Sequence, residues 1–65
     1  MNFNFQLLDE ARIEKGATIE NVCKAAEINP STWHRMINGD IKKPKLETIA
    51  RICKYLDINM NDLID

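Results

Sequence analysis

Hydrophobic positions recur along this chain at the three- and four-residue spacing of amphipathic helices. The stretch FQLLDEARIEK (5–15) predicts a first helix, with Leu7, Leu8 and Ala11 on one side and Gly16 as its natural end. A second short helix is predicted to begin after Thr18, a good N-cap residue. The apolar stripe of this second helix is Ile19, Val22, Cys23 and Ala26. Because no stretch alternates as a strand does and no internal repeat is apparent, the chain is expected to be all-α.

The stretch NPSTWHRMINGD (29–40) predicts a third helix over about 30–38. Asn29 is a strong N-cap, Pro30 suits the first helical position and Gly39 suits a left-handed end. The side that faces a core would carry Trp33, Met36 and Ile37, and the outward side Ser31, Thr32, His34 and Arg35. Only three residues separate this helix from the previous one, so 18–38 is expected to be two helices joined by a tight turn.

The remainder of the chain predicts two more helices. Pro44 is expected to open a fourth helix, whose apolar positions are Leu46, Ile49, Cys53 and Leu56. Asn59 is expected to cap a short last helix, with Leu63 closing back onto the core. The predicted fold is therefore a compact bundle of five short helices, forming one domain over residues 1–65.

Composition narrows the class of protein. The chain has 65 residues, of which 45% are hydrophobic and 29% charged, which is typical of a small globular domain. A domain of this length has a thin core, and oligomerisation is one way to stabilise it. No run of eighteen apolar residues and no secretory signal is present, so a cytoplasmic protein without a membrane association is expected. Cys23 and Cys53 stand at apolar helical positions, where buried reduced thiols are expected, a disulfide between them being the alternative. Without ligands at metal spacing, no metal, cofactor or small-molecule ligand is expected.

Charge is distributed unevenly along the chain. The net charge of −1 is unusual for a protein that binds nucleic acid. Residues 31–56, however, carry six basic and two acidic side chains, a local balance of +4, whereas 1–30 come to −2 and 57–65 to −3. Such a distribution would orient the middle of the chain toward an anion.

The order of these residues from about Leu8 to Leu63 resembles the helix-turn-helix domain of phage repressor and Cro-like regulators, the XRE-like family, whose fold is lambda-repressor-like. The resemblance rests on the joint spacing of a set of positions, which matches the family without insertions or deletions: Leu8, Arg12, Gly16, Thr18, Ser31, Thr32, Arg35, Asn38, Gly39, Pro44, Leu46, Glu47, Thr48, Leu56 and Leu63. It implies that the second helix crosses the DNA backbone and that the third lies in the major groove.

Carried over position by position, the resemblance implies two sets of DNA contacts. The residues that would contact bases are Pro30, Ser31, Thr32 and Arg35; Arg35 suits guanine, and Ser31 can donate or accept and so specifies weakly. The residues that would contact phosphates are Thr18, Asn29, His34, Asn38, Lys42, Lys43 and Lys45. In an arbitrary protein these side chains would be ordinary solvated surface. An apolar patch of Met60, Leu63 and Ile64 is the predicted dimerisation surface, because family members often pair through the last helix.

Four positions depart from the family pattern. Ile19 replaces a glutamine that contacts the DNA backbone, and Trp33, expected in the core, replaces an aliphatic residue. Glu27 replaces a turn glycine, so either Glu27 is strained or the second helix runs on. Ile37 replaces a glutamate that meets Arg12, so Arg12 needs another carboxylate, a carbonyl or water.

The leading functional hypothesis is a sequence-specific regulator of transcription that binds double-stranded DNA, of the kind encoded by phages, mobile elements and bacterial genomes. It would repress by occupying an operator, as a homodimer on an inverted repeat. The alternative is a helix-turn-helix fold that binds another regulator instead of DNA. An enzyme is not expected, because one histidine and scattered carboxylates form no catalytic constellation.

Overall fold

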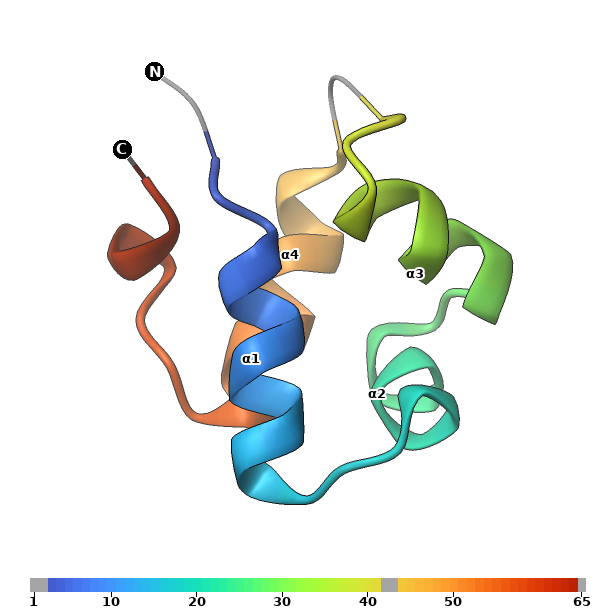
Figure 1. Ribbon diagram of the computed structural model, residues 1–65, viewed down its shortest axis with the longest axis horizontal. Helices are drawn as coiled ribbons and strands as arrows, with labels where there is room; N and C mark the ends of the chain where they lie inside the picture. Colours follow the sequence, from blue (N-terminus) through green and yellow to red (C-terminus); the bar gives the residue numbers. More distant parts are fainter. Residues whose placement is uncertain (1–2, 42–43, 65) are drawn as a thin grey trace.

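The structure is a computed structural model, and it describes residues 3–41 and 44–64. Its elements are α1 (Gln6–Lys15), α2 (Ile19–Ala26), α3 (Pro30–Ile37), α4 (Leu46–Leu56) and the 3-10 turn η1 (Met60–Leu63) (Figure 1). The all-α expectation is confirmed, because the described residues form no strand and their β pairing is one isolated bridge between Phe3 and Ile64. The predicted fifth helix is a single 3-10 turn rather than an α-helix.

Most helix ends have the predicted caps. Gly16 ends α1 with a φ of 80°, and Thr18 caps α2 by accepting a hydrogen bond from the Asn21 N–H over 3.0 Å. The predicted start of α4 is two residues too early. Lys45 is the N-cap with extended backbone, so Pro44 precedes the helix and does not open it.

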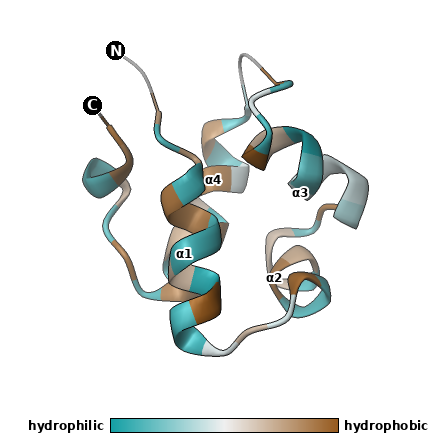
Figure 2. Cartoon of the chain, viewed as in Figure 1, coloured by the Kyte–Doolittle hydropathy of each residue, from teal (hydrophilic) through white to brown (hydrophobic). Residues whose placement is uncertain are grey.

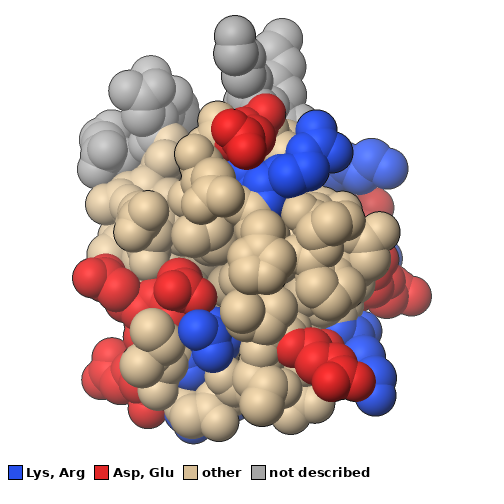
Figure 3. Space-filling model, turned by 45° about the vertical axis from the view of Figure 1, so that its right-hand side comes forward, with Lys and Arg blue, Asp and Glu red and all other residues tan. Residues whose placement is uncertain are grey.

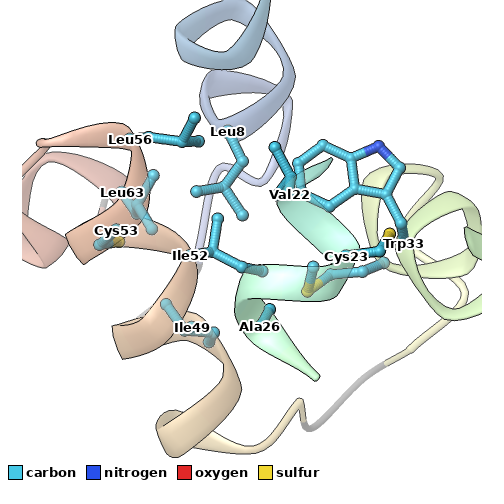
Figure 4. Packing of buried hydrophobic residues seen from close by; sticks show 11 residues of the cluster. Leu8, Val22, Cys23, Ala26, Trp33, Ile49, Ile52, Cys53, Leu56 and Leu63 are labelled. Carbon is cyan, nitrogen blue, oxygen red and sulfur yellow. The ribbon is translucent and has the colours of Figure 1, made fainter. Parts of the chain in front are cut away.

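The core is a cluster of buried hydrophobic side chains from all five elements (Figure 4). Its members are Leu8, Val22, Cys23, Ala26, Trp33, Met36, Ile49, Ile52, Cys53, Leu56 and Leu63. In Figure 2 the hydrophobic residues lie mainly on the sides of the helices that face one another. The expectation that Leu46 belongs to this core is wrong: Leu46 is 63% exposed and Ile52 is fully buried. The reason is that Leu46 lies in the first turn of α4, at the edge of its apolar stripe.

Both cysteines are free and buried, as predicted for reduced thiols. Figure 4 shows them apart, with Cys53 beside Leu63 and Cys23 on the side of Trp33. Burial raises the pKa of both thiols, and the negative charge of Asp62 raises that of Cys53 further. Both side chains therefore act as small hydrophobic residues in the core.

The chain contains an internal repeat, so the expectation that it has none is wrong. TIENVCKAAEIN (18–29) and TIARICKYLDIN (48–59) are identical at six of twelve positions. In the structure Thr18 caps α2, whereas Thr48 lies in the first turn of α4. Each of the two helices then ends at a left-handed residue that is followed by an isoleucine and an asparagine N-cap. The two helices, α2 and α4, also form the most extensive contact between elements. The repeat is hard to see in the sequence because only half of its positions are identical.

No helix within 3–41 or 44–64 is both long and apolar enough to cross a membrane.

Candidate nucleic-acid interface

A tight turn joins α2 to α3 at Glu27 and Ile28. Glu27 ends α2 in the left-handed conformation, with a φ of 59°, and the Ile28 N–H donates to the Cys23 carbonyl over 3.0 Å. Of the two possibilities for Glu27, the structure thus shows strain at this residue and not a longer helix. The connection is short and hydrogen-bonded, so it fixes the direction in which α3 leaves α2.

Two buried side chains hold α3 against the rest of the molecule. Trp33 and Met36 are each 1% exposed, which confirms the expected core position of the tryptophan. In Figure 4 the indole of Trp33 projects from α3 toward Val22 on α2. Burial of aromatic side chains contributes strongly to core stability, so the inner side of α3 is firmly anchored.

The outer side of α3 is polar and has no acidic residue. Ser31, His34 and Arg35 are exposed, and Thr32 is half-buried near the start of the helix. Arg35 forms no ion pair with any described residue. The predicted base-contacting side chains therefore lie on a polar surface of α3 whose charged residue is the basic Arg35, and Pro30 is exposed at the beginning of this surface.

The Asn29 side chain organises the beginning of α3. Its Oδ1 atom accepts a hydrogen bond from the Thr32 N–H (2.9 Å), from the Ser31 hydroxyl (2.6 Å) and from the Thr32 hydroxyl (3.0 Å). The sequence predicted the N-cap but not the two hydroxyl contacts. The only signal was the placement of two hydroxyl residues directly after a capping asparagine and a proline.

The residues predicted to contact phosphates are accessible where the structure describes them. Asn29, His34, Asn38 and Lys45 belong to the polar surface around α3 and the start of α4, and Thr18 caps α2. Asn29 and Lys45, the caps of α3 and α4, both line one cavity of about 650 Å³. The predicted contacts of Lys42 and Lys43 lie outside the described residues.

Arg51 contributes less to the basic region than its formal charge indicates. Its guanidinium pairs with the Glu27 carboxylate over 3.2 Å, and with that of Glu47 one helical turn earlier. Figure 3 shows acidic side chains close to the basic ones around a largely uncharged centre. The counted surplus of +4 in residues 31–56 is therefore partly neutralised, because a carboxylate from the acidic first part of the chain reaches into this region.

Arg12 binds a carboxylate and a backbone carbonyl in place of the glutamate expected from the family resemblance. Its Nε atom donates to Asp9 over 3.0 Å, and a terminal guanidinium nitrogen donates to the Ala17 carbonyl over 2.9 Å. The second contact ties α1 to the residue directly before the Thr18 cap. Ile19, in place of the family glutamine, is half-buried and packs against the core.

The predicted dimerisation surface is smaller than expected. Leu63 is fully buried and so is part of the core, not of a surface patch. Met60 is half-buried, and Ile64 is 37% exposed beside its bridge to Phe3. The reason is that Leu63 packs into the core cluster with Met60 against it, and the Asn4 N–H also donates to the Leu63 carbonyl.

Comparison with known proteins identifies a family for this chain. No curated protein and no solved structure matched the chain. The model of one family, the Cro/C1-type HTH DNA-binding domain, matches residues 8–65. This range includes the α2–turn–α3 unit and the polar surface of α3, as well as every buried residue of the core cluster. The chain belongs to the family of Cro/C1-type helix-turn-helix DNA-binding domains.

Proposed function

We propose that this protein is a sequence-specific regulator that binds double-stranded DNA and represses transcription by occupying an operator. The observation that carries the proposal is the surface of α3, in which Ser31 and Arg35 are exposed and Thr32 is half-buried, while Trp33 anchors the inner side of the helix. A rigid helix with this surface suits the major groove, where base edges offer hydrogen-bond donors and acceptors. The family membership supports DNA binding in general.

Within this proposal Arg35 has the main role in reading sequence. An arginine can donate two parallel hydrogen bonds to O6 and N7 of a guanine, and Arg35 is exposed and not paired with any described carboxylate. Ser31 and Thr32 contact neighbouring bases, and Pro30 packs against them at the beginning of the helix.

The phosphate contacts are those that the family resemblance implies, and hydrogen-bond polarity supports two of them. Phosphate oxygens only accept hydrogen bonds, so a side chain must donate to bind them. The Thr18 hydroxyl accepts from a backbone N–H, which leaves its own proton to donate. The Asn29 carbonyl oxygen accepts likewise, which leaves the amide N–H groups to donate. Lys45 supplies a positive charge at the cap of α4. The remaining proposed phosphate contacts are His34, Asn38, Lys42 and Lys43.

A homodimer on an inverted repeat completes the proposal. Two copies related by a two-fold axis would place two α3 helices about one DNA turn apart. The pairing surface in this proposal is that of Met60 and Ile64 beside Phe3. We propose that the protein acts in the cytoplasm, with no cofactor, small-molecule ligand or catalytic step.

The first experiment is the selection of bound duplexes from a random DNA pool with the purified protein at near-physiological salt. Recovery of an inverted repeat supports a dimeric operator binder. Affinity for the recovered duplex should then fall steeply as salt rises, because phosphate contacts release counterions. The absence of any enriched sequence would overturn the proposal.

A second candidate function is binding of another regulator through the same fold. It is favoured by the pairing of Arg51 with Glu27 and Glu47, which reduces the positive charge near α3. Salt separates the two candidates, because docking through an apolar surface such as Met60 and Ile64 changes little as ionic strength rises.

A further inference from the structure

The hydrogen bonds around Asn29 determine the polarity of the Ser31 hydroxyl. A backbone N–H can only donate, so the Asn29 atom 2.9 Å from the Thr32 nitrogen is the carbonyl oxygen, which can only accept. The Ser31 hydroxyl lies 2.6 Å from the same oxygen and must therefore donate to it. A serine hydroxyl has a single proton, so Ser31 presents only lone pairs to the solvent.

We infer that Ser31 acts as a hydrogen-bond acceptor for an exocyclic amino group in the major groove, and so selects adenine or cytosine on the strand that it contacts. The inference rests on the proposed function, since it assigns a base preference within the same surface. In the major groove the donors are the amino groups of adenine and cytosine, whereas guanine and thymine present acceptors at the corresponding positions. Each base pair has one such amino group, so Ser31 fixes the orientation of the pair.

The same polarity separates Ser31 from the side chains that suit phosphates. Ionised phosphate oxygens only accept, so they cannot bind a hydroxyl that offers lone pairs alone. Thr18 shows the reverse arrangement, because it accepts from the Asn21 N–H and keeps its proton. A serine and a threonine at the starts of adjacent helices thus have opposite roles, although both carry a hydroxyl group.

Of the two hydroxyls at Asn29, that of Ser31 is the better fixed. Three donors share an oxygen with two lone pairs, so one contact is weaker than the others. The Thr32 hydroxyl is 3.0 Å away and half-buried, whereas the Ser31 hydroxyl is 2.6 Å away and exposed. Ser31 is therefore the residue to which we assign the preference.

The test compares the sequences selected from a random duplex pool by the wild-type protein and by Ser31→Ala. At one position of each half-site, the wild type should prefer adenine or cytosine over thymine or guanine by about 3–10-fold, the value of one net hydrogen bond. Ser31→Ala should remove this preference and leave the position read by Arg35 unchanged. On the wild-type site, purine in place of that adenine, or 2-pyrimidinone in place of that cytosine, should lose the same factor, with no further loss when Ser31→Ala is added.

Asn29→Gly tests the role of the carbonyl oxygen, because glycine is itself tolerated at an N-cap. The freed Ser31 hydroxyl can then donate, so the preference should spread to thymine and guanine. A wild-type preference for thymine or guanine at the position that depends on Ser31, or an unchanged selection by Ser31→Ala, would overturn the inference alone. A pool from which the wild type enriches nothing would overturn the proposed function and the inference with it.

Discussion

The unit of α2, its turn and α3 and the unit of α4, its turn and η1 are built in the same way. In both, an isoleucine N–H donates to a cysteine carbonyl over 3.0 Å across a left-handed residue, Glu27 with a φ of 59° or Asp57 with a φ of 58°. Four residues after each asparagine cap, a large side chain is buried: Trp33 is 1% exposed and Leu63 is 0% exposed. The turn and the inward anchor are thus shared.

The units differ in the residues that come after the asparagine cap. After Asn29, a proline and two hydroxyl residues begin an eight-residue α-helix with a polar outer side and no acidic residue. After Asn59, a single 3-10 turn contains Asp62 and leads into the bridge with Phe3. The Asn59 side chain accepts from the Asn61 N–H, and no hydroxyl residue stands next to it in the sequence. The two units therefore share the hydrogen-bonded turn and the buried anchor. The candidate interface arises only in the first unit, from the residues that follow its asparagine cap.

The largest effect is expected at the shared anchors. Trp33→Ala should lower the free energy of unfolding by about 3–5 kcal/mol, and Leu63→Ala by about 2–5 kcal/mol, because each leaves a cavity in the core. A core of this size supplies roughly 3–5 kcal/mol in total, so Trp33→Ala should be largely unfolded. Urea titration followed by circular dichroism measures Leu63→Ala, and the helical signal without urea reports the unfolding of Trp33→Ala, with Ile13→Ala, at a 61% exposed position, as the control. A change below about 1 kcal/mol at Leu63 would contradict its role as the counterpart of Trp33.

The second largest effect should separate the outer surfaces of the two units. Arg35→Ala should lose roughly 1–3 kcal/mol of discrimination at one base pair of each half-site, whereas Lys54→Ala, an exposed basic position on α4, should leave base preference unchanged. Lys45→Ala should weaken binding to all duplexes alike and lower the salt slope by about one. Fluorescence anisotropy with the selected duplex and a scrambled one, at several salt concentrations, measures all three. If Arg35→Ala keeps the same preferred site at full affinity, α3 is not the reading element.

A smaller effect is expected at the left-handed turns. Asp57→Gly should stabilise the fold by about 0.5–1 kcal/mol, because glycine adopts a positive φ without a steric penalty. Glu27→Gly should gain less, since it also removes the exposed ion pair with Arg51, worth about 0–1 kcal/mol. In an Arg51→Gln background, the gain from Glu27→Gly should rise to that of Asp57→Gly. Thermal unfolding of these variants provides the comparison, and equal gains in both backgrounds would show that the ion pair contributes nothing.

Glu27 also shows which features of the fold local sequence signals can predict. Local signals predicted the caps Thr18 and Asn29 and the left-handed end at Gly16, because each depends on a few neighbouring residues. The conformation of Glu27 stayed open, because glycine usually occupies a left-handed turn position and a glutamate there does not by itself indicate a positive φ. Similarly, the hydrophobic spacing placed Leu46 in the core because it does not show where α4 meets its neighbours. The two hydroxyl donors to Asn29 Oδ1 could not be predicted from the sequence, because hydrogen bonds between side chains depend on atomic positions. The burial of Leu63, which removes it from the predicted dimerisation surface, likewise depends on the packing of the folded chain.

The smallest effect should distinguish the two equivalent cysteines. Burial raises the pKa of both thiols, but the Asp62 charge acts only on Cys53, so Asp62→Asn should lower the pKa of Cys53 and leave that of Cys23 unchanged. The shift should be small because Asp62 is exposed and water screens its charge. A thiol whose pKa is raised by folding contributes stability below its unfolded pKa of about 8.5, and this contribution is lost as the pH rises through the native value. Thiolate absorbance against pH, in Cys23→Ala and Cys53→Ala backgrounds, reports each thiol separately; an equal shift in both would mean that Asp62→Asn loosens the core rather than removing a local charge.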